Sequence, residues 1–160
     1  MNKNGITYRQ AVTDAAFEEG KRMFKEYVAS LGVDLSFQEF DKELQVIGVQ
    51  YNKPGGALLL VYDDSSAIGC AGIRKIDDET AELKRMYVRD GYRGYGIGVN
   101  LLEQSAEIAR ELGYKKIRLD TLRTMEKAQA LYRSFGFYEI PSYRFNPLEG
   151  TIYMEKLLIR

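Results

Sequence analysis

The chain has 160 residues, of which 45% are hydrophobic, enough for one folded domain with a sizeable core. Lysine plus arginine and aspartate plus glutamate both number 23, and this zero net charge argues against nucleic acid or an anionic membrane as a partner. Because the sequence has one cysteine and no histidine, it excludes an internal disulfide, a Cys/His zinc site and a histidine-dependent triad.

We expect one cytoplasmic domain over residues 1–160. No internal repeat or Pro/Ser-rich linker divides the chain. The longest apolar run, residues 57–62, is too short to span a membrane. Residues 1–5 lead into polar sequence and lack the apolar segment of a secretory signal.

The first third of the chain predicts a strand and two helices. Residues Ile6–Val12 alternate between apolar and polar side chains, which is typical of a strand. Residues Phe17–Leu31 have helical apolar spacing, and Gly32 is placed to end that helix. Residues Ser36–Glu39 resemble a capping box. A second helix after it would bury the apolar stripe Phe37, Phe40, Leu44 and Ile47.

The middle of the chain predicts three consecutive strands. A turn at Pro54–Gly56 precedes them, and they run over Ala57–Tyr62, Ile68–Ile76 and Thr80–Val88. Short polar turns separate them, so neighbouring strands should be antiparallel. Cys70 lies in the second strand between small residues, and we expect it to be a core side chain.

The last third alternates helices and strands. A helix over Gly96–Leu112 is followed by a strand over Lys116–Leu122 and a helix over Thr124–Phe135 that Thr124 would cap. Two strands close the chain, Phe137–Ile140 and Thr151–Leu158. The last of them could pair across a homodimer or lie at an edge of the sheet. This order predicts an α+β fold, a mixed sheet flanked by helices.

The most informative segment is the glycine-rich turn that follows Thr80–Val88. Gly94, Gly96 and Gly98 let main-chain N–H groups approach a ligand closely, just where a helix begins. Such a helix start offers unpaired donors and a partial positive charge, which suit phosphate oxygens. The G-x-G-x-G spacing matches neither a P-loop nor the dinucleotide fingerprint. The competing interpretation is a flexible turn that only begins a helix.

Two segments resemble the GNAT N-acetyltransferases. Arg93–Gly98 is similar to motif A of that family, Arg/Gln-x-x-Gly-x-Gly/Ala, and Ala128–Phe137 is similar to its Leu-Tyr-x-x-x-Gly-Phe segment. The resemblance implies the GNAT fold, a mostly antiparallel sheet with one splayed parallel strand pair and about four flanking helices. The candidates for that pair are Thr80–Val88 and Lys116–Leu122.

The resemblance also implies acetyl-CoA as co-substrate and no metal. In the family the amides of the turn hold the CoA pyrophosphate, and the preceding strand pairs with pantetheine. On this chain the implied cofactor-binding residues are Met86, Tyr87, Val88, Arg93, Gly94, Tyr95, Gly96, Ile97, Gly98 and Val99. Asp120 and Thr121 end the next strand, where a mixed sheet borders its ligand crevice. Thr121 could bind cofactor or cap the following helix.

Two side chains are candidates for the chemistry. Tyr132 matches the tyrosine that many GNAT enzymes use to protonate the departing thiolate, although its helical spacing also suits an ordinary core tyrosine. Glu82 is the candidate base, directly or through a water. Strand alternation would put Glu82 on one face with Met86 and Val88. The alternative is an exposed Glu82 that pairs with a neighbouring cation.

We expect the acceptor to be a small-molecule or peptide amine, for which Arg85 and Tyr143 are candidate binding residues. Arg85 could hold an acceptor carboxylate in bidentate fashion. Because no convincing nucleophile is present, the sequence favours direct transfer from acetyl-CoA to a primary amine in a ternary complex. The alternative is a non-catalytic acyl-CoA-binding sensor with the same fold.

Overall fold

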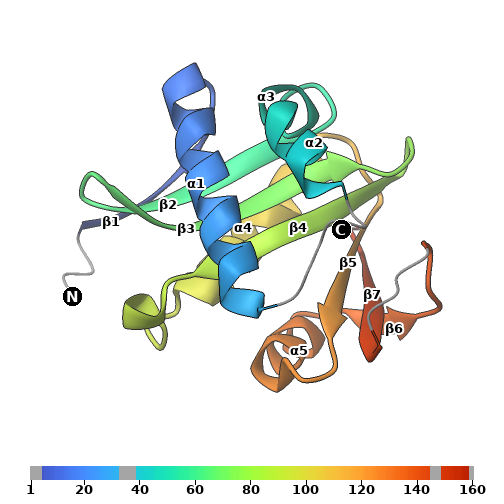
Figure 1. The fold of residues 1–160 in the computed structure, drawn as a ribbon. Coiled ribbons are helices and arrows are strands. Elements are labelled where there is room, and N and C mark those ends of the chain that lie inside the picture. The colour runs from blue at the N-terminus through green and yellow to red at the C-terminus, as the bar shows by residue number, and fades with distance from the viewer. Residues whose placement is uncertain (1–4, 33–38, 145–148, 159–160) are drawn as a thin grey trace.

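Within residues 5–32, 39–144 and 149–158, which this computed structural model describes, seven strands form one mixed sheet in the order β1-β2-β3-β4-β5-β7-β6 (Figure 1). Every neighbouring pair is antiparallel except β4 and β5. The predicted fold class is therefore confirmed. The strands are β1 (Ile6–Gln10), β2 (Ala57–Asp63), β3 (Ser66–Lys75), β4 (Thr80–Val88), β5 (Lys116–Leu122), β6 (Tyr138–Ile140) and β7 (Thr151–Leu157).

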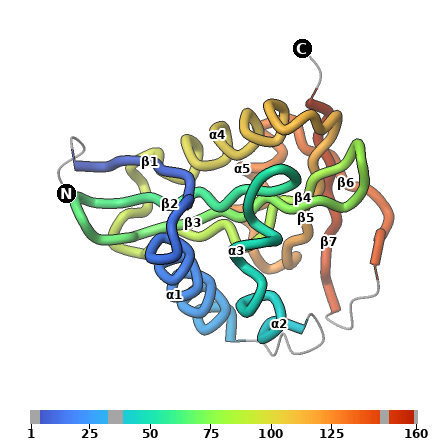
Figure 2. The backbone as a smooth tube through the Cα atoms, turned by 90° about the horizontal axis from the view of Figure 1, so that it is seen from above, coloured from blue at the N-terminus to red at the C-terminus, as the bar shows by residue number. Residues whose placement is uncertain are grey.

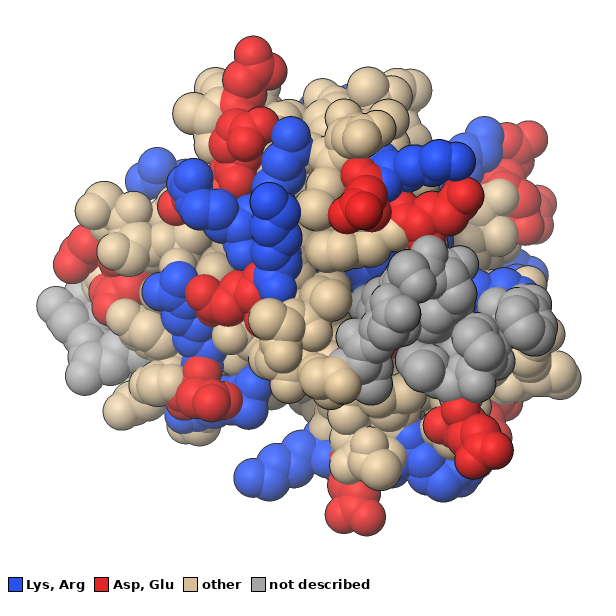
Figure 3. Space-filling view, in the orientation of Figure 1, with Lys and Arg blue, Asp and Glu red and all other residues tan. Residues whose placement is uncertain are grey.

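Helices cover both faces of this sheet. Figure 2 shows α1, α2 and α3 on one side and α4 on the other. The bounds are α1 (Asp14–Leu31), α2 (Phe40–Gln45), α3 (Ile47–Gln50), α4 (Ile97–Glu111) and α5 (Glu126–Ser134), with a 3-10 turn, η3, at Asp90–Tyr92. No helix in the described part of the chain is both long and apolar enough to cross a membrane. Acidic and basic side chains are interspersed over the face that α1 and α2 cover (Figure 3).

Two hydrophobic clusters lie on opposite faces of the sheet. The larger one contains Leu101 and Leu102 of α4, Tyr132 of α5 and the strand side chains that face them. The smaller one contains Phe17 and Phe24 of α1 together with the strand side chains on the other face. Cys70 is fully buried in this second cluster, as predicted.

Helix α1 begins and ends at recognisable signals. The Thr13 hydroxyl accepts a hydrogen bond from the Ala16 N–H at 3.1 Å, which satisfies one free donor of the first turn. Gly32 follows the helix with φ +66°, a conformation that glycine adopts without steric cost. The predicted end at Gly32 is confirmed, and the helix begins three residues before the predicted start.

One predicted cap lies mostly outside the described residues, and another is wrong. Residues 36–38 of the proposed capping box lie outside the described residues, and Glu39 precedes α2 with φ +53° and no side-chain cap. The predicted second helix is divided at Val46 into α2 and α3. Thr124 does not cap α5, because Met125 occupies the N-cap position without a side-chain hydrogen bond. No capping side chain marks the starts of α2, α3 and α5, so local sequence did not reveal them.

The closing strand β7 lies inside the sheet rather than at its edge. It pairs with β5 along its whole length and with β6 on its other side. Residues 153–155 of β7 have strand partners on both sides, so the expectation that β7 lies at a sheet edge is wrong. The short β6 is the edge strand at that end.

A β-bulge interrupts β4 at Arg85, which has φ +59°. Cys70 is opposite Tyr87, but Gly72 is opposite Lys84, so β4 carries one extra residue between these pairs. Side chains after the bulge change faces. The predicted alternation is therefore wrong, because Met86 and Val88 pack in the larger hydrophobic cluster with Leu83 instead of sharing the face of Glu82.

The parallel strands β4 and β5 pair only where they begin. The pairs are Thr80 with Lys116, Ala81 with Ile117, and Glu82 with Arg118. Beyond the last pair the two strands diverge (Figure 1). The splayed parallel pair that the family resemblance implied is therefore present.

Gly72 is expected to tolerate no side chain. A Cβ there would lie 2.5 Å from Cε1 of Tyr51, a ring that is fully buried and cannot move aside. We expect Gly72→Ala to lower the free energy of unfolding in urea by about 1–3 kcal/mol, the usual cost of overpacking. Gly48→Ala is the matched control, because its Cβ would meet only Phe17 at 3.8 Å. Equal stability of the two variants would contradict the tight packing.

Candidate functional site

A cleft of about 1060 Å³ opens where β4 and β5 diverge. Its walls come from the end of α1, the end of β4, the glycine-rich turn and α5. Most of the predicted cofactor residues line it, namely Met86, Tyr87, Val88, Arg93, Gly94, Gly96, Ile97, Gly98 and Val99. The structure thus brings the strand end and the turn together around one space.

The glycine-rich turn presents the free amino end of α4 to this cleft. Gly94 and Gly96 have φ +88° and +78°, values that disfavour any residue with a Cβ. Gly96 is the N-cap of α4 and provides no side-chain cap. The first N–H groups of the helix are therefore available to an anion, and the helix dipole favours negative charge there.

The two arginines beside the turn have different roles. Arg89 forms a bidentate ion pair with Glu26 of α1, at 2.8 and 2.9 Å. This pairing holds the pKa of the Glu26 carboxyl below its usual value. Arg93 lines the cleft, donates from Nε to the Val88 carbonyl at 3.2 Å and contacts Asp90. Arg93 therefore ties the turn to the end of β4.

Tyr132 is buried in the wall of the cleft, on α5. Its ring packs against Phe137 at a centroid distance of 5.8 Å, and no described residue forms a hydrogen bond with its hydroxyl. Burial raises its pKa, so the phenol stays protonated through the neutral range. A protonated hydroxyl at the wall of a cleft can donate a proton to a ligand.

Glu82 is fully buried at the last pair of β4 with β5. Arg74 donates to its Oε1 at 2.8 Å, and the Tyr143 hydroxyl donates to its Oε2 at 2.6 Å. Arg144 also forms an ion pair with Oε2. The predicted base is thus neither exposed nor paired with a single neighbour, because three donors surround it.

Residues 12–137 match the family model described as the acetyltransferase (GNAT) family. The chain belongs to the GNAT family. It is 36% identical over 156 residues to an uncharacterized N-acetyltransferase of Schizosaccharomyces pombe, which covers 96% of each chain. An uncharacterized N-acetyltransferase of Dictyostelium discoideum is 29% identical over 204 residues, covering 89% of this chain and 94% of that protein.

Solved GNAT structures share the fold. A crystal structure of an acetyltransferase from Streptococcus agalactiae has a TM-score of 0.77 at 21% identity and covers 96% of this chain and 98% of that one. A GNAT family acetyltransferase from Elizabethkingia anophelis with acetyl-CoA bound has a TM-score of 0.64 at 20% identity. The match covers 97% of this chain and 99% of that one.

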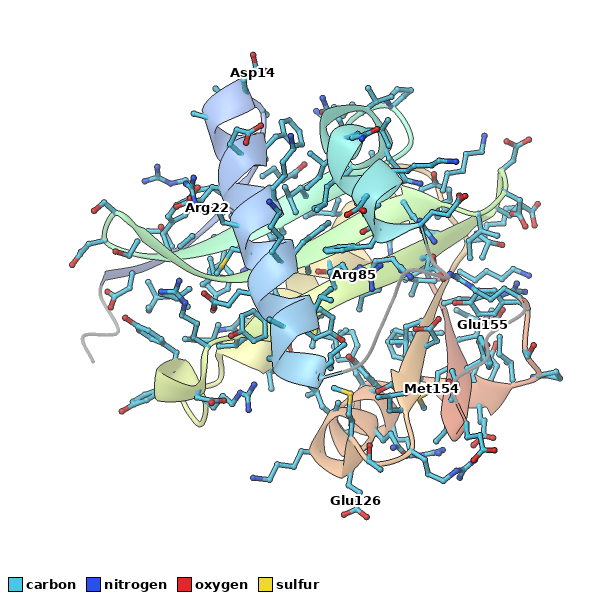
Figure 4. All side chains as sticks on the ribbon, in the orientation of Figure 1. Asp14, Arg22, Arg85, Glu126, Met154 and Glu155 are labelled. Carbon is cyan, nitrogen blue, oxygen red and sulfur yellow. The ribbon has the colours of Figure 1, made fainter. Side chains whose placement is uncertain are left out.

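The candidate acceptor residues of this GNAT chain are occupied by internal contacts. Arg85 forms two hydrogen bonds with Glu43 of α2, at 2.9 and 3.2 Å, and Glu43 also accepts one from the Tyr51 hydroxyl. Figure 4 shows Arg85 on β4, beneath the helices of that face. Tyr143 donates to Glu82 and lies between Arg118 and Arg144, whose guanidiniums are 5.3 and 4.9 Å from its ring centroid.

Three residues differ from the sequence interpretation. Tyr95 and Thr121 do not line the cleft, and the Thr121 hydroxyl contacts Met125 Sδ at 3.8 Å. Tyr27 does line it, although it was not among the candidate site residues. The Tyr27 ring lies 5.7 Å from that of Tyr87, and burial raises its pKa to about 12. The helical stripe that contains Tyr27 faces both core and cleft, which spacing alone does not distinguish.

Proposed function

We propose that this chain transfers the acetyl group of acetyl-CoA directly to a primary amine while both substrates are bound. The observation that carries the proposal is the cleft between β4 and β5, which has the free amino end of α4 at one wall and the Tyr132 phenol at another. The Elizabethkingia anophelis relative, which holds acetyl-CoA, supports the choice of donor.

The residues of the cleft fit the parts of that donor. The amides after Gly96 suit the diphosphate, because they are uncapped and lie at the positive end of the helix dipole. The N–H of Arg89 donates to Ile68 of β3. Because main-chain groups alternate between the two edges of a strand, those of Val88 point toward the open edge and β5. A pantetheine arm can pair with that edge.

The transfer needs a neutral amine, a stabilised oxyanion and a protonated leaving group. The amine nitrogen attacks the thioester carbonyl, so a C–N bond forms and the C–S bond breaks. A main-chain N–H at the open edge of β4 can stabilise the oxyanion. Tyr132 can give its proton to the departing thiolate as the C–S bond breaks, so that coenzyme A leaves as the thiol. Tyr132 then regains the proton that the amide nitrogen loses.

A calorimetric titration with acetyl-CoA, followed by a thiol-release assay across a panel of primary amines, tests this function. Saturable binding together with thiol release on at least one amine is the expected result. Binding without thiol release on any amine would favour the acyl-CoA sensor instead. No binding of acetyl-CoA would overturn both.

Gly96→Ala is expected to weaken acetyl-CoA binding about tenfold. The left-handed conformation at φ +78° costs a residue with a Cβ roughly 1–2 kcal/mol, so the binding-competent turn becomes less populated. Calorimetry measures the change. Gly91→Ala is the matched control, because it lies in the same turn, has no positive φ and would meet no atom within 4 Å. Equal acetyl-CoA affinities for the two variants would show that this turn does not bind acetyl-CoA.

A further inference from the structure

Two carboxylates lie on the strands beneath the cleft, and they differ in what surrounds them. Glu82 accepts from Arg74, Tyr143 and Arg144. Asp120 is on β5, and its Oδ2 is buried with no hydrogen-bond partner in the described part of the chain. A buried carboxylate oxygen without a donor is costly unless something else supplies one.

The register places Asp120 at the point where the strands diverge. Arg118 is the last residue of β5 that pairs with β4, and Leu122 lines the cleft. Arg118, Asp120 and Leu122 lie on one face of β5, whereas the alternate residues are buried. On this face of β5, Asp120 therefore lies between Arg118, where pairing with β4 ends, and Leu122, which lines the cleft.

The groups around Asp120 include Tyr153 of β7, its cross-strand partner in the sheet. The charge of Asp120 contributes to the raised pKa values of Tyr27 on α1, Tyr132 on α5 and Tyr143 after β6. Lys84 lies at the same level on β4, where burial lowers its pKa to about 7 and Asp120 opposes that shift. Lys84 therefore carries only part of a positive charge near neutral pH. Tyr153 packs edge-on against Tyr143 at a ring-centroid distance of 5.1 Å, so the carboxylate has aromatic rings beside it.

We propose that Asp120, rather than Glu82, receives the ammonium group of the acceptor and takes its proton. This inference rests on the acetyl transfer proposed above and names its acceptor class, a protonated primary amine. The ammonium provides the missing donor for Oδ2 of Asp120, and the tyrosine rings nearby favour a cation. Glu82 instead holds the loop of Tyr143 and Arg144 against the sheet through its ion pairs.

Protons balance in the proposed step. The ammonium gives one proton to the Asp120 carboxylate and becomes a neutral amine, which then attacks the thioester. The nitrogen loses its second proton after the C–N bond has formed, and the thiolate gains one through Tyr132. Asp120 returns its proton to solvent, so the reaction releases one proton for each acetyl group transferred.

The test compares Asp120→Asn with the wild-type protein between pH 7 and pH 10. The probe is the amine of the panel above that has the highest kcat/KM with the wild-type protein. At pH 7 we expect Asp120→Asn to lower kcat/KM by about 10²–10⁴-fold, the usual contribution of a general base. The loss should shrink as pH rises, because an alkyl amine has a pKa of about 10 and increasingly arrives neutral.

Two measurements separate this role from a structural one. Acetyl-CoA binding by calorimetry should stay at its wild-type value in Asp120→Asn. Glu82→Gln should lower the melting temperature and show an activity loss that does not change with pH. Glu103→Gln, on the exposed face of α4, is the neutral control for an acid-to-amide change.

Either of two results would overturn the assignment: wild-type kcat/KM in Asp120→Asn, or a loss that is the same at every pH. A loss in Glu82→Gln that shrinks with rising pH would assign the base to Glu82 instead. Failure of the proposed function itself would look different, because the wild-type protein would then release no thiol with any amine.

Discussion

Tyr132→Phe is expected to lower kcat by about 10²–10⁴-fold, the range for loss of a general acid, while acetyl-CoA binding stays unchanged. The substitution removes only the hydroxyl, which no described residue binds. The ring that packs against Phe137 remains. The thiolate must then leave without a proton from the protein. Steady-state thiol release measures kcat, and calorimetry measures the affinity for acetyl-CoA.

The control for this experiment is Tyr62→Phe, on β2 and away from the cleft lining. It should turn over at the wild-type rate. If Tyr132 were only a core aromatic residue, Tyr132→Phe would also keep wild-type turnover, and the role of proton donor would be wrong. Burial raises the pKa of Tyr132, so ionisation of this phenol should not limit activity in the neutral range.

Arg85→Met is expected to destabilise the protein by about 3–5 kcal/mol, because it leaves the Glu43 carboxylate buried without its cation. Both side chains are only 4% exposed. The Tyr51 hydroxyl also donates to Glu43 at 3.0 Å, and the Phe40 ring lies 5.2 Å from the guanidinium. Unfolding in urea at neutral pH measures the loss. The double variant Glu43→Gln/Arg85→Met should recover a large part of it, because neither charge of this pair remains.

The Glu43–Arg85 ion pair should also make the stability of the protein depend on pH in the acidic range. Burial opposes ionisation of Glu43, but the hydrogen bonds from Arg85 and the positive charges of Arg85, Lys84 and Arg74 together outweigh it and hold the pKa of the carboxyl below its usual value. A lowered folded-state pKa contributes stability above the unfolded value of about 4.3, and this stability is lost as pH falls through the folded pKa. The stability gap between wild type and Arg85→Met should therefore narrow in acid. A constant gap from pH 7 to pH 3 would contradict the ion-pair explanation.

The sequence allows prediction of most of the fold because its strongest signals are local. The three strands Ala57–Tyr62, Ile68–Ile76 and Thr80–Val88 were identified within two residues at each end. Gly32, Gly113 and Gly136 all follow helices with positive φ, as a stop signal requires. The glycine-rich turn was identified for the same reason, since its function depends on residues that are adjacent in sequence.

The features that escaped prediction depend on distant residues. Arginine does not favour a positive φ, so nothing in β4 marks the bulge at Arg85. The bulge is held by Glu43, which is 42 residues away, and by a hydrogen bond from the Cys70 thiol to the Arg85 carbonyl at 3.1 Å. The surroundings of Glu82 are similar, because Tyr143 and Arg144 reach it from the other end of the chain.

The short pairing of β4 with β5 has a thermodynamic consequence. Past Glu82 and Arg118, the facing edges of these two strands do not bond to each other. A ligand that carries amide groups can fill the gap in the manner of an inserted strand, so its occupancy is linked to the folding equilibrium. At one hundred times its Kd such a ligand would add about 2.7 kcal/mol to the free energy of unfolding. The concentration of that ligand would then set the stability of the folded protein as well as its reaction rate.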